Sequence, residues 1–206
     1  MSLKTLQEKA GVKPDGSFGP NTFKAAAKYL NITDHASAVH FFAQCAHESG
    51  NFSRYTENLN YSWQGLRKVF GKYYKTDEEA KAHHRNPELI ANRVYGGRMG
   101  NPSNEGYLWR GRGAIQLTGR NNYVKFCNDL DTHEEGAAVM ANPDLVASDY
   151  AFESAAWFFD DNNIWALCYN DLSEDAVRKV TRKINGGYNG LKHRLELTEK
   201  YSKYAL

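Results

Sequence analysis

The sequence predicts a mainly α-helical protein with little or no β-structure. Apolar residues recur at helical spacing, most clearly from Ala36 to Ala46. Residues that favour helix N-termini precede several such segments, and Gly or Pro separates them. Only residues 114–118 alternate apolar and polar side chains as a strand does. About nine helices are therefore expected, with hardly any strand.

Length and composition indicate one soluble globular domain. The chain has 206 residues, of which 41% are hydrophobic and 24% charged. A chain of this length can form a hydrophobic core without disulfides or structural metals. A formal net charge of +2, without any run of five basic residues, argues against a nucleic-acid partner. Three cysteines without paired spacing predict no disulfide framework. We expect a single domain over residues 1–206, with residues 1–20 as a lead-in.

The first thirty residues predict two short helices around a turn. The helices are expected over residues 3–10 and 21–30, and a Pro-Asp-Gly sequence between them is a turn signal. Residues 1–7 lack the apolar core of a signal peptide, and no apolar stretch approaches the length of a membrane span. We therefore expect no signal peptide and no stable membrane insertion.

Residues 36–46 form the most apolar segment and should be a buried helix. Four polar residues fall on one face of it: His40, Gln44, His47 and Glu48. The polar side chains of a buried helix need hydrogen-bond partners, and we expect this face of the helix to line a solvent-filled cleft. Glu48 ends the helix just before Gly50, where the helix dipole disfavours a negative charge. We expect its carboxyl to favour the protonated form, as a general acid requires.

A second glutamate, Glu57, follows nine residues after Glu48. Its surroundings are rich in Asn, Ser and Tyr, which can keep a carboxylate hydrated and ionised. Two carboxylates in contrasting environments are the usual equipment for cleaving a glycosidic bond. The alternative is that Glu48 pairs with Arg54 at a helix end and that Glu57 is a solvated loop acid. The buried character of the preceding helix favours the first interpretation.

Capping signals predict the next helices. One should run over residues 62–74, another should open at the Thr76 capping box, and a third should cover residues 86–95. Residues 98–106 are expected to be a loop, because Gly, Asn and Pro occur throughout.

Residues 107–123 alternate glycine with arginine, which is not typical of a helix. Within them, residues 114–118 predict a short strand or extended strip with Gln116 and Thr118 on one side. An extended backbone that presents amides, hydroxyls and an aromatic ring suits a sugar-binding cleft. The alternative is a glycine-rich connection whose polar residues cap nearby helices.

The C-terminal third predicts three further helical regions. Asn-Pro at residues 142–143 opens the first, which includes the apolar residues 151–159. Ser173 can cap a helix through Ile184, which Asn-Gly-Gly at residues 185–187 should end. Residues 190–204 are expected to form the last helix.

Four motifs occur in order: His-Glu-Ser-Gly at 47–50, Glu-Asn-Leu-Asn-Tyr-Ser at 57–62, Tyr-Leu-Trp-Arg-Gly-Arg-Gly-Ala-Ile-Gln-Leu-Thr-Gly at 107–119, and Ile-Asn-Gly-Gly at 184–187. Together they resemble glycoside hydrolase family 19, which contains chitinases and the peptidoglycan-cleaving endolysins of bacteriophages. The resemblance runs from about residue 20 to the C-terminus and implies a lysozyme-like, bilobal α fold with a deep cleft. The short chain and the close glutamates resemble the endolysins more than the plant chitinases.

The resemblance implies a role for each matching residue. Glu48 is similar to the general acid of the family, Glu57 to its general base, and Thr118 to a residue that holds the attacking water. Because the family inverts at the anomeric carbon, its two carboxyl groups should lie roughly 6.5–9.5 Å apart. Asn189 stands where many plant members carry an acid. Positions similar to sugar-contacting residues are Gln116, Asn122, Asn185 and Arg194.

Aromatic residues near these motifs could stack on sugar faces, although core packing is the alternative for each of them. These residues are Tyr61, Trp63, Tyr95, Tyr107 and Trp109. Among them, Tyr61 and Trp109 are our predicted substrate contacts.

The resemblance predicts an endolysin that hydrolyses β-1,4 bonds of peptidoglycan for host lysis. Its expected partners are glycan strands. We expect a monomer without cofactor or metal, held in the host cytoplasm until a holin-type pore gives access to the periplasm. The alternatives are a chitinase and a non-catalytic wall-binding module, the latter because residues 11–22 resemble part of a peptidoglycan-binding repeat. The zinc-protease motif is absent, since no second His follows His47-Glu48 at the required spacing.

Overall fold

The computed structural model describes residues 2–206, which form thirteen helices and no β-strand longer than an isolated bridge. The prediction of a mainly α fold is therefore confirmed. The chain divides into two compact units. Unit 1 contains the described residues up to Tyr55, with Gly113–Gln116 and Asp144–Leu206. Unit 2 contains Thr56–Arg112 and Leu117–Pro143.

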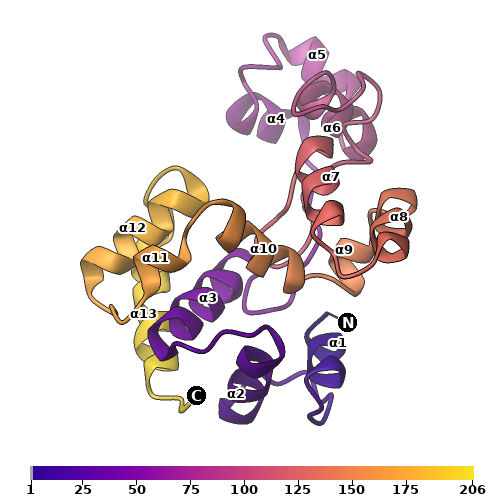
Figure 1. Cartoon of the computed structure of the whole chain (residues 1–206). Coiled ribbons are helices and arrows are strands. Elements are labelled where there is room, and N and C mark those ends of the chain that lie inside the picture. Colours follow the sequence, from indigo (N-terminus) through magenta and orange to yellow (C-terminus); the bar gives the residue numbers. More distant parts are fainter. Residues whose placement is uncertain (1) are drawn as a thin grey trace. The chain divides into compact units, whose positions relative to one another are not determined.

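Unit 1 is built around one buried helix. Its helices are α1 (Ser2–Lys9), α2 (Pro20–Tyr29), α3 (His35–Glu48), α9 (Leu145–Ser148), α10 (Glu153–Asp161), α11 (Trp165–Cys168), α12 (Glu174–Asn185) and α13 (Leu191–Ser202). The central helix, α3, contacts α2, α11, α12 and α13 (Figure 1). Every residue from Ala36 to Ala46 is buried, as the apolar pattern predicted.

Local signals fix both ends of α3. Asp34 caps the N-terminus by accepting a hydrogen bond from the Ser37 backbone N–H. After Ser49, the chain turns sharply because Gly50, Asn51 and Phe52 all have positive φ angles. The helix therefore ends at Glu48, as predicted, and places that carboxylate in its last turn.

The N-terminal lead-in belongs to the core of unit 1. Leu3 and Leu6 from α1 join the same apolar cluster as α3. The buried Gln7 organises the turn that follows, because its amide donates to Asp15, the Ser17 carbonyl and Thr22. This side chain closes the predicted Pro-Asp-Gly turn against the beginning of α2.

Unit 2 contains five helices: α4 (Trp63–Val69), α5 (Asp77–Ala82), α6 (Pro87–Tyr95), α7 (Arg120–Asn128) and α8 (His133–Ala141). The predicted caps of the first three are confirmed, since Ser62, Thr76 and Asn86 each accept a backbone N–H bond. The helix predicted to reach about Tyr74 ends instead at Val69, two residues before Gly71. Glycine destabilises the interior of a helix because it loses more conformational entropy than other residues do.

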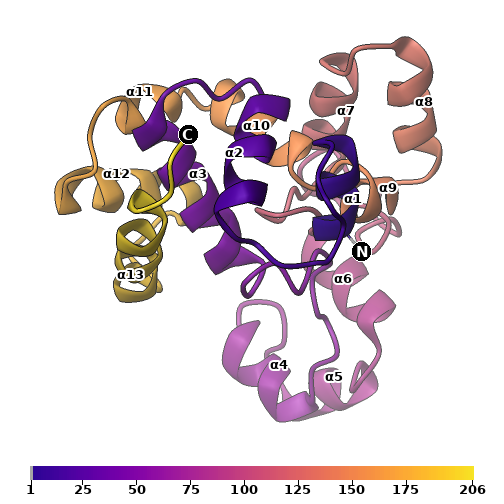
Figure 2. The same ribbon diagram turned by 90° about the horizontal axis from the view of Figure 1, so that it is seen from below.

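Two helices of unit 2 were missed by the sequence analysis. The helices α7 and α8 lie side by side (Figure 2). A capping box formed by Thr132 and Glu135 starts α8, with the same sequence signal that had been recognised at Thr76. The signal was therefore present, and the omission was not a tertiary effect.

The strand predicted over residues 114–118 was wrong. Residues 113–116 form a turn, and the nearby pairing consists of isolated bridges from Arg112 to Thr56 and to Leu117. Gly113 and Gln116 have φ angles of +81° and +62°, which break the extended backbone that alternation had suggested. Among residues 2–206, no helix is both long and apolar enough to cross a membrane.

Candidate active site

The predicted site residues are shared between the two units. Unit 1 contains Glu48, Gln116, Asn185 and Arg194. Unit 2 contains Glu57, Tyr61, Trp109, Thr118 and Asn122.

In unit 1, Glu48 forms an ion pair with Arg194 from α13. The Arg194 side chain is only 1% exposed, whereas that of Glu48 is 22% exposed. The guanidinium donates to Glu48 Oε1, and no hydrogen bond to Oε2 is found within residues 2–206. Glu48 therefore pairs with the buried Arg194 of the last helix and not with Arg54, as the alternative interpretation had it.

The same arginine is tied to two other groups. Its Nη1 donates to the Gln44 side-chain carbonyl, and its Nε donates to the Asn189 carbonyl at 3.3 Å. All three guanidinium nitrogens are thus used to fix Arg194 relative to α3 and to the turn before α13. Arg194 is placed to position Glu48, and in this conformation its donors face protein groups.

The polar stripe of α3 is satisfied mainly inside unit 1, which corrects the expectation of a solvent-filled cleft along it. His40 and Gln44 have no exposed surface. His40 Nε2 donates to the Asp171 carbonyl at 2.7 Å, and Gln44 Nε2 donates to Thr181 Oγ1 at 3.4 Å. Only the C-terminal end of the stripe, at His47 and Glu48, is partly exposed.

A histidine pair lies beside the Glu48–Arg194 pair. The Nδ1 atoms of His47 and His193 are 2.9 Å apart, so that one must donate a proton and the other must accept it. Each histidine directly precedes a member of the ion pair, and α3 and α13 are therefore joined by two consecutive contacts. Burial, followed by the nearby Arg194 charge, lowers the pKa of His47 and favours its neutral form.

Gly190 makes room for this arrangement. A methyl group at this position would overlap the His47 imidazole, and the residue has a φ angle of +70°. Upstream, Asn185 closes the turn by accepting from the Gly187 N–H at 2.8 Å and donating to the Asn189 carbonyl at 3.1 Å. Asn185 therefore shapes the segment that holds Arg194, and its predicted contact with sugar stays a prediction.

In unit 2, Glu57 is held by neutral donors on both oxygens. The Tyr95 hydroxyl donates to Oε1 at 2.6 Å, and the Gly111 N–H donates to Oε2 at 3.2 Å. The Glu57 N–H also donates to the Gly111 carbonyl at 2.9 Å. Burial, reinforced by the Glu57 charge, raises the pKa of Tyr95, which therefore stays a protonated donor at neutral pH.

Thr118 and Asn122 are close neighbours in unit 2. Asn122 Nδ2 donates to the Thr118 carbonyl at 2.8 Å, which ties the start of α7 to the preceding loop. Gln116, in unit 1, donates through Nε2 to the Gly113 carbonyl at 3.1 Å and closes its own turn. All three side chains are partly exposed. Their predicted roles stay predictions, since no ligand contact is described.

Trp109 is 3% exposed and belongs to the interior of unit 2. Its ring packs edge-on against Tyr123 at 5.3 Å, and its indole N–H donates to Glu105 at 3.0 Å. This placement favours the core-packing alternative, because a stacked sugar would need an accessible ring face. Tyr61 is half-buried and packs edge-on against Phe70 at 5.2 Å, which leaves part of its surface accessible.

No sequence pattern predicted a role for His193, Gly190 or the Gln44 contact with Arg194. Nothing local marks these residues, because their partners are about 150 positions away in the chain. The buried Arg112 was also missed. It donates to the Leu108 carbonyl at 2.8 Å and to the Tyr123 hydroxyl at 3.0 Å, and so holds the glycine-rich segment of unit 2 together. Within the described part of the chain, no group of three or more His, Cys, Asp or Glu side chains could hold a metal ion.

Two glutamates in contrasting environments, one held by a buried arginine and one by neutral donors, suit the paired carboxyl chemistry of a glycoside hydrolase. Comparison with known proteins identifies the family. The chain is 45% identical over 160 residues, 76% of its length, to a glycosyl hydrolase family 19 domain-containing protein from Haemophilus influenzae, of which it covers 74%. The chain therefore belongs to glycosyl hydrolase family 19.

A second relative matches a shorter region. The chain is 44% identical over 64 residues to an acidic 27 kDa endochitinase from Solanum lycopersicum, which is 30% of this chain and 23% of that protein. No family model matches the chain. The family assignment confirms the sequence resemblance and makes the protein a chitinase-like glycoside hydrolase.

Proposed function

We propose that this protein is an endolysin that hydrolyses β-1,4 glycosidic bonds of bacterial peptidoglycan by an inverting acid/base mechanism. Membership of glycosyl hydrolase family 19 supports hydrolysis of an N-acetylhexosamine glycan. The observation that carries the acid/base assignment is the contrast between the two glutamates, since Glu48 keeps one oxygen without a described partner while both oxygens of Glu57 are bonded.

In this mechanism, Glu48 protonates the leaving glycosidic oxygen. Arg194 holds Oε1 and thereby fixes the carboxyl plane, so that Oε2 is the oxygen that carries and donates the proton. The His47–His193 contact and the Gln44 hydrogen bond hold the same two helices in register. Positioning of this kind matters because a misplacement of about 1 Å can cost about 100-fold in rate.

Glu57 acts as the base that removes a proton from the attacking water. Tyr95 and the Gly111 N–H fix its two oxygens, and each oxygen retains a second lone pair that can accept from water. Thr118 has a hydroxyl that can both donate and accept, as a residue that orients the water must. The water then attacks the anomeric carbon on the face opposite the leaving group, and the configuration inverts.

The acid/base assignment is tested with purified Glu48→Gln and Glu57→Gln proteins on peptidoglycan. Each substitution should lower the rate of wall lysis by at least about 100-fold, because amides neither donate nor accept the proton. A Glu105→Gln variant, altered at a carboxylate bonded to Trp109, controls for the chemical change. Full lysis by either catalytic variant would refute the assignment, provided that circular dichroism shows a native fold.

A chitinase is the second candidate, and the match to the Solanum endochitinase favours it. Both substrates contain β-1,4-linked N-acetylglucosamine, so the glutamate pair alone does not separate them. Parallel assays on permeabilised Gram-negative cells and on soluble chitin oligomers would do so. Our proposal expects the higher kcat/KM on peptidoglycan, and mass spectrometry of the digest identifies the new reducing end. A strong preference for chitin would favour the second candidate.

The proposal includes how the enzyme reaches its substrate. We propose that it acts as a monomer on glycan strands and passes from the host cytoplasm to the periplasm through a holin-type pore. Purified enzyme added outside should then leave intact Gram-negative cells unlysed and should lyse them once the outer membrane is permeabilised. Lysis upon cytoplasmic expression without a pore-forming protein would contradict this part.

A further inference from the structure

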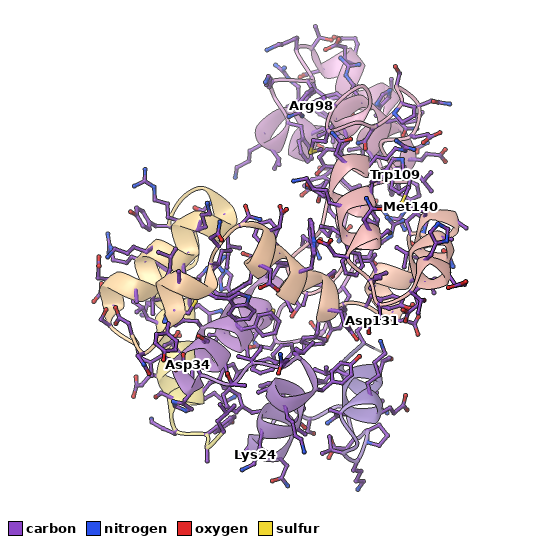
Figure 3. The ribbon with its side chains drawn as sticks, in the orientation of Figure 1. Lys24, Asp34, Arg98, Trp109, Asp131 and Met140 are labelled. Atoms are coloured by element: carbon purple, nitrogen blue, oxygen red, sulfur yellow. The ribbon has the colours of Figure 1, made fainter. Side chains whose placement is uncertain are left out.

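A cavity of about 320 Å³ opens in unit 1 at the N-terminal end of α3. Asp34, the cap of that helix, is among its lining residues, and Figure 3 labels this side chain. The predicted acid, Glu48, lies at the opposite end of the same helix. Because α3 has 14 residues with a rise of about 1.5 Å each, the two places are about 20 Å apart. The cavity is therefore separate from the surroundings of Glu48.

Two aromatic rings line this cavity. Tyr169 is 65% exposed, which is unusually high for so large a ring. Trp165 is partly exposed and rests on Phe41 and Phe159, with ring centroids at 5.6 and 4.7 Å. The Trp165 indole N–H donates to Asp160 Oδ1 at 2.8 Å. The Trp165 ring is thus held in place by its packing and its hydrogen bond, whereas the Tyr169 ring is accessible to a ligand.

The rim of the cavity is tied down by hydrogen bonds. Asp34 accepts from the Ser37 N–H at 2.7 Å and from the Asn170 N–H at 3.3 Å, which attaches the segment after Tyr169 to α3. His40 adds a second tie by donating to the Asp171 carbonyl at 2.7 Å. A ligand would meet a largely preformed site and would lose little affinity to the ordering of the protein.

The polar groups of the lining suit a neutral polyhydroxylated ligand. The exposed side chains of Asn31 and Thr33 form no hydrogen bond to any of residues 2–206. An amide and a hydroxyl can each donate and accept, as sugar hydroxyls and acetamido groups require. The two carboxylates, Asp34 and Asp160, are acceptors, and no Lys or Arg lines the cavity among the described residues. This charge disfavours phosphates and carboxylates as ligands.

We propose that this cavity is a second glycan-binding site, which holds an N-acetylhexosamine unit against Tyr169 while Asn31, Thr33 and Asp160 bond its polar groups. The choice of ligand rests on the glycan-hydrolase family of the chain and does not depend on whether peptidoglycan or chitin is preferred. The site holds the enzyme on its polymer without taking part in bond cleavage.

The direct test uses ¹⁵N-labelled Glu48→Gln protein titrated with N,N′-diacetylchitobiose. Binding should shift the Trp165 indole N–H signal with saturation. Tyr169→Ala should weaken this binding about two- to tenfold, as expected for the loss of one stacking ring, and Tyr169→Phe, the matched control, should retain it. An unmoved Trp165 signal, or equal affinity in the Tyr169→Ala protein, would overturn the proposal.

Ligand chemistry and catalytic role need separate controls. A primary amine such as lysine methyl ester should leave the Trp165 signal in place, and a shift with the amine but not with the sugar would identify a cation site instead. In the active enzyme, Tyr169→Ala should slow hydrolysis of insoluble polymer and leave kcat/KM on a soluble oligomer unchanged. An equal loss on both substrates would contradict a separate site. The lysis assay of Glu48→Gln tests the acid/base assignment independently of all these readouts.

Discussion

The two predicted catalytic glutamates are held differently in their own units. In unit 1, a buried, charged arginine holds Glu48 through one oxygen. In unit 2, two neutral donors hold Glu57, one on each oxygen. An ionised carboxylate accepts all three of these hydrogen bonds, but only the contact between Arg194 and Glu48 also has a charged donor. The comparison teaches that the proposed proton donor keeps an oxygen available, whereas the proposed base is constrained at both.

The largest effect on activity is expected from removing the charged partner. Arg194→Met should lower the free energy of unfolding by about 1–3 kcal/mol, because the acceptors of Arg194 lose their donor while Glu48, which is 22% exposed, stays partly solvated. Activity should fall at least about 100-fold, because Glu48 loses its orientation. Arg194→Lys keeps the charge but not the planar fork and should recover only part of both. Urea denaturation and lysis rates measure these effects, and a fully active Arg194→Met protein would show that the pair does not position Glu48.

The second prediction uses two glycines with similar backbones. Gly190 and Gly186 have φ angles of +70° and +73°, so an alanine at either should cost about 1–2 kcal/mol of conformational strain. Only at Gly190 would the new methyl group overlap His47, which should add about 1–3 kcal/mol and reduce activity. Gly186 has no atom within 4 Å of such a methyl group and is the matched control. Equal losses in the two variants would disprove a role for the His47 contact.

Features of the fold that depend on neighbouring residues were predictable from the sequence, whereas features that depend on distant residues were not. Caps at Ser62, Thr76 and Asn86 were predictable, because each depends on residues within one turn. The turn at residues 113–116 was not, because it depends on distant residues: a side chain at Gly113 would meet Ser154 and the Ala151 carbonyl, which alternation cannot reveal. Alternation of apolar and polar residues was therefore mistaken for a strand.

Site prediction shows the same dependence on range. The motifs pointed to both glutamates and the family resemblance pointed to Arg194, and the catalytic and binding roles of these residues stay predictions. That His193 would meet His47, or that Gly190 would have to lack a side chain, had no signal in the sequence. The polar stripe of α3 was correctly placed on one face, but its partners, Asp171 and Thr181, come from elements far along the chain. Hence a cleft was expected where protein groups satisfy the stripe.

A smaller effect is expected in unit 2, where the donor to Glu57 is a neutral hydroxyl. Tyr95→Phe removes the hydroxyl that donates to Glu57 at 2.6 Å and leaves the ring in place. Activity should fall roughly tenfold, corresponding to about 1.4 kcal/mol, with the loss mainly in kcat. Tyr107→Phe, a similar change in the same unit, is the control and should retain activity. If Tyr95→Phe cost more than Arg194→Met, the contrast between the two units would be reversed.

The smallest effect concerns the pH dependence of unit 1. Burial lowers the pKa of His40 below 6.5, and its Nδ1 is buried without a partner among residues 2–206. Below pH 6.5 the unfolded chain therefore binds the proton more readily, and stability present above that pH is lost as the pH falls towards the lowered value.

A single histidine such as His40 can change the free energy of unfolding by at most about 1.4 kcal/mol per pH unit. Urea denaturation between pH 8 and pH 5 measures it. His40→Gln should give a flatter profile, whereas His133→Gln, changed at an exposed position of α8, should follow the parent protein. Identical profiles for all three proteins would show that His40 does not govern this dependence.

The most direct test of the two roles compares leaving groups. In a p-nitrophenyl glycoside of an N-acetylglucosamine oligomer, the leaving group is p-nitrophenolate, which departs without needing a proton. With this substrate, loss of the acid should therefore matter less than loss of the base. Glu48→Gln should lose much more activity on the natural polymer than on this substrate, because general acid catalysis typically contributes about 10²–10⁴-fold. Glu57→Gln should lose activity equally on both. The reverse pattern, or equal losses for Glu48→Gln on the two substrates, would contradict the assignment of Glu48 as acid and Glu57 as base.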